Sequence, residues 1–341
     1  MWHVGIDLHR RTVVLSAVNE SGQAFAPVTI PCWDEQRIVE VLKGLTPFRA
    51  VIEATATYRW LYNLISPYGA FLLAHPLKLR AMIQRRSKTD KIDAMLLANL
   101  LRIDQVPLAY IPSARYQYLR DVVRYRVRLG RSFGHLKVAV QALLARHNIF
   151  APYRDLSGVR GESWLLKQDF GSAENWVRDD LVARLRSVRL QIIAAEEKLE
   201  GIRNEYPEVE ALLDIHGVGL YTALLIIGEI GEPGRFVNGG QVSAYAGLTA
   251  RVNQSGGHCY YGHITKQGSA WLRWILVEAG MQAIRRDDKL ANFYARVRKR
   301  SSAKIARVAV ARKLAEICWK RLRAWHRTHS IVGRVRFAEA V

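Results

Sequence analysis

The first hundred residues alternate between two hydrophobic patterns. Short β-branched and aliphatic runs between polar or glycine positions predict strands, and apolar residues three or four positions apart predict helices. The predicted strands are two within residues 1–18, on either side of a polar tip, then 23–30, 49–53 and 69–74. The predicted helices are 34–43, 58–66, one that begins at Pro76, and 91–102. Three consecutive strands followed by crossover connections predict an α/β domain with a mixed sheet flanked by helices.

Two longer amphipathic stretches follow, at residues 113–148 and 172–206. In the second stretch, aliphatic residues recur every three or four positions, a spacing that is typical of a coiled-coil seam. The segment 149–171 contains one proline and three glycines, which predict a linker. We therefore expect a helical stalk whose two helices pair either within one chain or between subunits.

The last region, 207–341, is predicted to be mostly α-helical. A helix that ends near Leu213, a Gly-x-Gly turn at 216–219 and a helix at 221–229 form a helix-hairpin-helix signature. Glycines in such a turn let backbone N–H groups and a helix N-terminus approach a phosphate. A packed turn between two helices is the alternative interpretation.

Composition and charge narrow the class of partner. The chain has 341 residues, half of them hydrophobic, which is enough for the cores of two or three domains. Its formal net charge is +21, and residues 1–110 hold 13 basic and 9 acidic residues, so +4 lies there and +17 in the remainder. This asymmetry predicts a polyanionic partner bound mainly by the later regions, with nucleic acid favoured over a membrane surface because neutralised phosphates release counterions.

The sequence also indicates a compartment. It contains no apolar run of roughly 20 residues, the length that a membrane-spanning helix needs. The N-terminal residues lack a signal-peptide pattern, and three widely separated cysteines imply no disulfide framework. We therefore expect a cytoplasmic protein and no membrane partner, and the family resemblance described below implies association with the bacterial nucleoid.

Four acids change the interpretation of the first domain. Asp7 lies in the first strand, Glu53 ends a later strand, and Asp90 and Asp93 begin a helix, where residues three apart share a face. Singly, they are ordinary turn or helix N-terminal acids. Together and in this order they form the ribonuclease-H-like pattern, in which a sheet gathers carboxylates around one or two Mg²⁺ ions. Mg²⁺ is a hard cation that prefers oxygen ligands, and two such ions stabilise the attacking and leaving oxygens of phosphoryl transfer.

At this point the chain resembles a known family, the one-ten family of bacterial insertion-sequence transposases. The acids lie in segments similar to that family's DEDD set, at residues 5–9, 51–55 and 88–94. Its C-terminal transposase domain is matched at residues 216–219, 244–249, 254–257, 264–268 and 272–273. The chain departs from the pattern at Ala250, where the family often has proline.

The resemblance implies a DNA recombinase that moves its own element. Its serine, which corresponds to Ser255, would attack a DNA phosphate and stay attached to the 5′ end, while Asp7, Glu53, Asp90 and Asp93 hold Mg²⁺. It further implies an element-encoded noncoding bridge RNA that pairs with donor and target DNA, and a tetramer built as a dimer of dimers. The residues themselves add that Ser255 lies beside two glycines and far in sequence from the acids, so its activation requires a composite site.

Further residues are expected to contact nucleic acid. Lys266 and Arg273 follow the serine, and residues 285–327 contain fifteen Lys and Arg against three Asp and Glu. Tyr260 and Tyr261 suit base stacking, although packing is the alternative that we favour from sequence alone. The predicted nucleic-acid-binding residues are His216, Gly217, Gly219, Gly256, Lys266, Arg273, Arg285, Arg286, Arg298, Lys299, Arg300 and Lys304.

We thus expect three parts: a RuvC-like catalytic domain at 1–110, a helical stalk at 111–206, and a C-terminal transposase domain at 207–341 that contains the helix-hairpin-helix, Ser255 and basic helices. Two other functions stay open. A Holliday-junction-type nuclease would use the same acids with metal-activated water and leave free 5′-phosphate ends. A non-catalytic nucleic-acid-binding scaffold would show salt-dependent binding without a metal effect.

Overall fold

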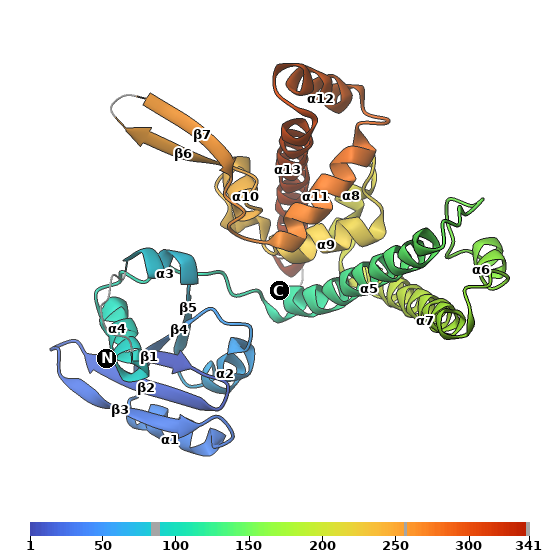
Figure 1. Ribbon diagram of the computed structural model, residues 1–341. Coiled ribbons are helices and arrows are strands. Elements are labelled where there is room, and N and C mark those ends of the chain that lie inside the picture. The colour runs from blue at the N-terminus through green and yellow to red at the C-terminus, as the bar shows by residue number, and fades with distance from the viewer. Residues whose placement is uncertain (83–88, 256–257, 339–341) are drawn as a thin grey trace. The chain divides into compact units, whose positions relative to one another are not determined.

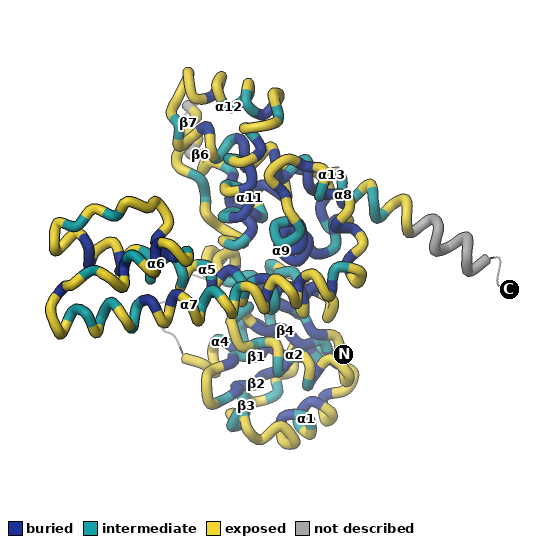
Figure 2. Tube along the Cα trace, turned by 90° about the vertical axis from the view of Figure 1, so that its right-hand side faces the viewer, coloured by how far each residue is buried: buried dark blue, intermediate teal, exposed yellow. Residues whose placement is uncertain are grey.

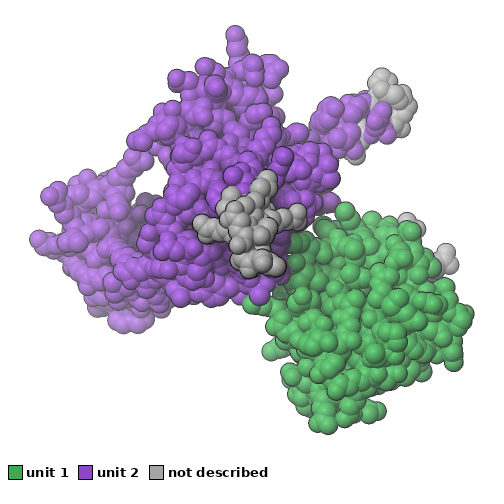
Figure 3. All heavy atoms as spheres, turned by 180° about the vertical axis from the view of Figure 1, so that it is seen from behind, with its two compact units in different colours: residues 1–111 green, residues 112–341 purple. Residues whose placement is uncertain are grey.

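The chain forms two compact units, residues 1–111 and 112–341, which Figure 3 shows in different colours. The computed structural model describes residues 1–82, 89–255 and 258–338. Each unit has its own hydrophobic core. Because the long helices and the C-terminal region belong to one unit, the division into three parts stays a prediction.

The first unit is built on a five-stranded mixed sheet (Figure 1). Its strands are β1 (Trp2–Leu8), β2 (Thr12–Asn19), β3 (Ala24–Pro31), β4 (Phe48–Glu53) and β5 (Ala70–Ala74). Their spatial order is β3-β2-β1-β4-β5, with β1, β2 and β3 antiparallel and β1, β4 and β5 parallel. This confirms the mixed sheet that the hydrophobic pattern predicts.

Helices cover both faces of this sheet. They are α1 (Glu35–Gly44), α2 (Tyr58–Ile65), α3 (Pro76–Met82) and α4 (Asp90–Arg102). Val4 and Ile6 of β1 share a core with residues of α1 and α2. Successive strand residues point to opposite faces, so Gly5 and Asp7 lie on the other face, which α4 covers.

A glycine allows α4 to lie close to the sheet. A Cβ atom at Gly5 would come within 1.9 Å of the Ala94 carbonyl oxygen and 2.5 Å of the Ala98 nitrogen. These are backbone atoms, so a side chain at this position would push α4 away from β1. Gly5 therefore determines how near the start of α4 comes to the end of β1.

The second unit begins with an intramolecular helical hairpin. Helices α5 (Ala114–Arg146) and α7 (Ser172–Gly201) lie side by side. Two ion pairs show that they are antiparallel: Arg126 contacts Glu196 at 2.6 Å, and Arg146 contacts Glu174 at 3.2 Å. Of the two pairings that the sequence left open, the described chain thus shows the one within a single subunit. Helix α7 ends at Gly201, five residues before the predicted end.

The segment 149–171, expected to be a linker, contains helix α6 (Val159–Leu165). Its Leu156, Leu165 and Phe170 are buried in one cluster with residues of α5 and α7. The three glycines and the proline in this segment therefore mark turns around a small core at the end of the hairpin.

The main core of this unit surrounds α9 (Leu220–Ile230), which is buried from Ala223 onward (Figure 2). Around it pack α5, α8 (Glu210–Leu213), α10 (Gly239–Tyr245), α11 (Ala270–Ala283) and α13 (Ala303–Ala338), while α12 (Asp288–Arg300) packs on α13. Three short 3-10 turns complete the connections, at Arg203–Glu205, Pro207–Val209 and Pro233–Arg235. This confirms a mostly helical region after the sheet domain.

Strands β6 (Ala250–Ser255) and β7 (His258–Ile264) form a separate two-stranded hairpin that projects from the helices of its own unit (Figure 1). Tyr260 and Tyr261 on β7 are exposed, so the packing role expected for them is wrong. Over the residues that the structure describes, no helix combines the length and the apolar character needed to cross a bilayer.

Candidate metal centre and nucleic-acid surface

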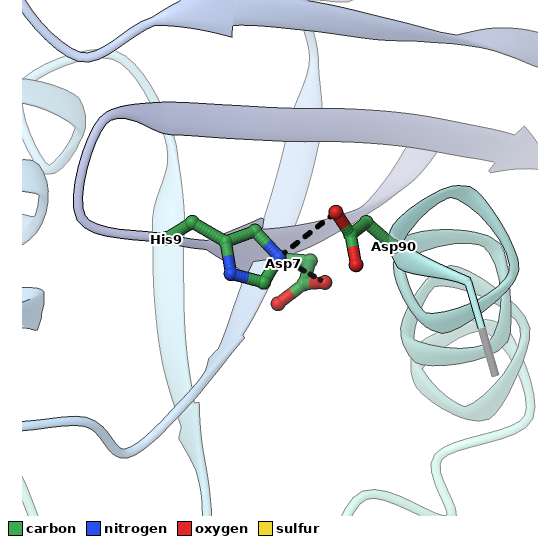
Figure 4. A group of neighbouring side chains, drawn as sticks. All are labelled: Asp7, His9 and Asp90. Atoms are coloured by element: carbon green, nitrogen blue, oxygen red, sulfur yellow. Dashed lines mark hydrogen bonds and ion pairs between the residues drawn. The ribbon is translucent and has the colours of Figure 1, made fainter.

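Three side chains meet at the end of β1 (Figure 4). The Nε2 atom of His9 lies 3.1 Å from Oδ2 of Asp7 and 3.2 Å from Oδ2 of Asp90. One ligand atom from each residue lies within 4.8 Å of the other two, which is close enough for all three to bind one ion. Asp7 is the least exposed of the three side chains.

Local structure explains why these residues meet. Asp7 points to the α4 face at the end of β1, and the turn that follows is closed by the His9 N–H, which donates to the Thr12 carbonyl at 2.9 Å. At the other side, the Ile92 N–H donates to Oγ1 of Thr89 at 3.4 Å, a side-chain cap that begins α4 and places Asp90 in its first turn. A backbone hydrogen bond thus fixes the turn after β1, and a side-chain cap fixes the start of α4.

The electrostatics of the site favour a cation. Burial raises the pKa of Asp7, and the nearby carboxylates of Asp90 and Asp93 raise it further, while His9 lowers it. An acid that is partly desolvated among other acids is costly to ionise unless positive charge compensates it. The donor set of two carboxylates and one imidazole suits a divalent metal ion, and its oxygen ligands suit Mg²⁺.

The four predicted acids differ in how close they lie to the three-residue group. Asp7 and Asp90 belong to the three-residue group, and Asp93 lies near enough to act on the pKa of Asp7. Glu53 does not belong to that group and is exposed. Its position still points to the site, because Ile52 pairs with Ile6 in parallel register, which places Glu53 beside Asp7 at the ends of neighbouring strands and on the same face.

His9 is the member of the group that sequence reasoning missed. It belongs to the quoted motif 5–9, but only the acids of the motif were selected as ligands. The signal was its spacing of two residues from Asp7 at a strand end, a spacing that allows both side chains to point the same way.

Ser255 is the last residue of β6, and its backbone pairs with His258 at the start of β7. Gly256 lies outside the described residues. Ser255 belongs to the second unit and the acids to the first, so their meeting over one scissile bond stays a prediction.

The helix-hairpin-helix turn and two arginines form one basic pocket in the second unit. This pocket has a volume of about 530 Å³, and it is lined by Leu213, Ile215, His216, Gly217, Val218, Gly219, Gln282, Arg285 and Arg286. It therefore brings together five predicted nucleic-acid-binding residues from two segments that are far apart in sequence, 216–219 and 285–286. Its lining contains cationic side chains and no carboxylate.

Gly217 shows that the turn is also a packed one. Its φ angle is +84°, and a Cβ atom there would lie 2.6 Å from the Ala279 carbonyl oxygen of α11. The two interpretations from sequence are therefore compatible, because the close packing on α11 brings the turn beside Arg285 and Arg286.

The remaining predicted contacts differ in their surroundings. Arg273 donates a hydrogen bond to the Ala246 carbonyl at 2.9 Å, and burial lowers its pKa, so it supports the loop before β6, a role that the sequence did not predict. Lys266 is exposed. The other predicted cations are also exposed. Three lie at the end of α12 and one at the start of α13: Arg298, Lys299, Arg300 and Lys304.

A cluster of two carboxylates and a histidine on a mixed sheet, followed by a basic helical unit, is typical of enzymes that act on nucleic acid. Comparison with known proteins agrees. The transposase family with the DEDD domain of IS110 matches residues 4–149, and the IS116/IS110/IS902 transposase family matches residues 209–295. The chain belongs to the IS110/IS116 family of insertion-sequence transposases, which confirms the resemblance.

Individual relatives carry the same kind of name. The chain is 30% identical over 328 residues to the transposase for insertion sequence element IS1111A of Coxiella burnetii, covering 93% of this chain and 88% of that one. It is 27% identical over 293 residues to the putative transposase y4qE of Sinorhizobium fredii, covering 83% and 68% of the two chains. The putative transposase y4pF/y4sB of the same organism is 25% identical over 326 residues, covering 93% and 83%.

Proposed function

We propose that this transposase cuts and rejoins DNA with Ser255 as nucleophile and with Mg²⁺ held by a ribonuclease-H-like domain. The metal-binding part of this proposal rests on one observation, which is that Asp7, His9 and Asp90 converge at the end of β1. The strand order β3-β2-β1-β4-β5 supports it, because it places β1 and β4 side by side, with Asp7 and Glu53 at neighbouring ends.

Asp7 and Asp90 would hold the ion, and Glu53 and Asp93 would complete its surroundings. A bound Mg²⁺ supplies positive charge that stabilises the oxygens of the reacting phosphate. His9 contacts both carboxylates and is in reach to orient them. This assignment includes the four acids of the DEDD set and adds the histidine.

The serine step conserves the number of phosphodiester bonds. Oγ of Ser255 attacks the phosphorus, the bond from phosphorus to the 3′ oxygen breaks, and a 5′-phosphoserine link forms. The hydroxyl proton leaves Oγ, and the departing 3′ oxygen takes up a proton. Attack of a different 3′ hydroxyl on the phosphoserine then rejoins the strands and releases the serine.

The nucleic-acid partners follow from the second unit. The basic pocket at the helix-hairpin-helix turn and the cations on α12 and α13 suit phosphate backbones, which are bound through counterion release. The family resemblance supports donor and target DNA, a bridge RNA that pairs with both, and a homotetramer. Co-purification of the protein and sequencing of the bound RNA would identify that RNA.

The decisive test of the serine uses Ser255→Ala, with Ser187→Ala as the control on the exposed surface of α7. We expect Ser255→Ala to abolish covalent protein–DNA adducts, trapped by denaturation and detected by gel electrophoresis, while RNA binding stays at the wild-type level. Ser187→Ala should form adducts normally.

Persistence of adducts in Ser255→Ala would show another nucleophile. Free 5′-phosphate ends without adducts in the wild-type protein would instead favour the nuclease that uses metal-activated water. Normal nucleic-acid binding with no cleavage and no metal effect would favour the scaffold.

A further inference from the structure

The β6–β7 hairpin carries large side chains that its own unit leaves uncovered. The exposed fractions are 54% for Val252, 69% for Tyr260 and 76% for Tyr261. The hairpin consists of two strands and projects from the helices of its own unit, and no other described element of that unit forms a layer over its faces (Figure 1). Exposed tyrosines on a projecting hairpin point to a binding role.

The strand register distributes the two rings over both faces. Val252 pairs with Tyr261, and residue 253 pairs with Tyr260. Residues that pair directly share a face and successive residues alternate, so Tyr261 lies with Val252 on one face and Tyr260 lies on the other. A hydrogen bond with Cys259, two residues away, raises the pKa of Tyr261 and agrees with this arrangement.

The charge of the β6–β7 hairpin indicates the class of molecule that it binds. The sequence contains no Asp or Glu from residue 233 to residue 277, a range that includes the whole hairpin, while Arg251 and Lys266 lie at its base and are exposed. A surface that combines aromatic rings with cations and lacks acids suits nucleic acid, because the rings stack on bases and the cations contact phosphates.

The geometry also gives a position on the DNA. Ser255 pairs with His258, and Tyr260 and Tyr261 follow His258 by two and three residues. At about 3.4 Å per strand residue, the tyrosines lie about 7 and 10 Å along the hairpin from the serine. In duplex DNA, successive nucleotides of one strand rise about 3.4 Å along the helix axis, so these lengths correspond to two to three nucleotides.

We propose that Tyr260 and Tyr261 stack on DNA bases two to three nucleotides from the phosphate that Ser255 attacks. They act as positioning residues, and because the rings lie on opposite faces of the hairpin, each holds the bases on its own face while the serine reacts. The distance from the scissile phosphate rests on the function proposed above, whereas the stacking itself does not.

The test measures binding of fluorescein-labelled single-stranded and duplex DNA of fixed sequence to the full-length protein by anisotropy over a range of salt concentrations. Tyr260→Ala and Tyr261→Ala should each weaken binding by about 5- to 150-fold, the range for loss of one base-stacking contact. Tyr260→Phe and Tyr261→Phe should restore wild-type affinity, because they keep the ring.

Two controls separate stacking from charge and from general exposure. The alanine variants should leave the salt dependence unchanged, whereas Arg251→Gln should reduce its slope by about 1. Trp176→Ala removes a ring that is 71% exposed on α7, and it should bind DNA as the wild type does.

Wild-type affinity in both alanine variants would overturn the proposal, and so would phenylalanine variants as weak as the alanine ones. Loss of self-association by sedimentation, without loss of DNA affinity, would show that the rings bind a second copy instead. If Ser255→Ala kept forming adducts while the tyrosine variants lost DNA affinity, the serine mechanism would fail and the stacking would stand.

Discussion

Each unit contains a carboxylate that is partly or fully removed from water, and the two carboxylates differ in their surroundings. In the second unit, Glu229 of α9 is fully buried, but Arg124 of α5 contacts both of its oxygens, at 2.7 and 3.0 Å, and Ser269 donates a hydrogen bond to it at 2.8 Å. In the first unit, Asp7 is partly buried beside Asp90, and its pKa is raised by burial. One carboxylate has a guanidinium on both of its oxygens, whereas the other has His9 at 3.1 Å and also faces the acids Asp90 and Asp93.

This difference distinguishes an acid that the fold neutralises from an acid that we propose to bind a metal ion. Glu229 is neutralised by the fold, so it joins α5 to α9 without a ligand. Asp7 keeps an unfavourable charge that the fold does not fully neutralise, which is typical of groups that bind or react with something else. The contrast can be tested by removing the charge, the partner or the close packing.

The largest expected effect is the loss of reaction in Asp7→Asn. We expect strand exchange to fall by at least about 100-fold, because removal of a metal ligand sacrifices several kcal/mol of transition-state stabilisation. Exchange on supercoiled donor and target DNA, in the presence of the bridge RNA proposed above, measures it. Asp104→Asn, an exposed acid of the same unit, is the control.

The same variant should lose metal-dependent stability. At a Mg²⁺ concentration of 100 times Kd, the wild type should gain about 2.7 kcal/mol in its free energy of unfolding, reversibly with EDTA, and Asp7→Asn should gain much less. Without divalent cation, Asp7→Asn should be no less stable than the wild type at neutral pH, because an acid with a raised pKa opposes folding above its unfolded value of 3.8. Undiminished exchange or an undiminished metal response would show that Asp7 is structural.

The second effect is on stability alone. Arg124→Leu leaves Glu229 buried without its guanidinium, so the free energy of unfolding should fall by about 3–5 kcal/mol, with no dependence on Mg²⁺. Urea denaturation followed by circular dichroism measures it. Arg184→Leu breaks an exposed pair with Asp180 at 2.8 Å and should cost less than about 1 kcal/mol. If Arg124→Leu and Arg184→Leu lowered the free energy of unfolding equally, burial of the ion pair would not determine its contribution to stability.

The smallest effect tests the close packing that brings Asp90 to Asp7. Gly5→Ala should cost about 1–3 kcal/mol and weaken Mg²⁺ binding, measured by calorimetry, because its Cβ atom would push α4 from β1. Gly44→Ala, in a helix where the added Cβ meets no atom within 4 Å, should do neither. If folded Gly5→Ala bound Mg²⁺ with unchanged affinity, metal binding would not depend on the close packing of α4 on β1.

Much of the first unit could be predicted from local patterns. Strand residues alternate with a period of two and helix residues with a period near 3.6, so the elements around Asp7, Glu53 and Asp90 are readable from neighbours in sequence. His9 was missed because its role depends on Asp90, 81 positions away along the chain by number. The helix in 149–171 was missed because glycine and proline suggest turns without showing what packs between them.

What the sequence alone determined is the set of acids, their order, the excess of positive charge and the family, since each depends on residue identity and short-range spacing. The tertiary structure decided which carboxylate receives a partner: Arg124 and Glu229 are 105 residues apart, and only packing of α5 on α9 joins them. It also decided that the rings of Tyr260 and Tyr261 stay exposed. Burial and pairing depend on contacts between distant segments, and a local pattern does not contain those contacts.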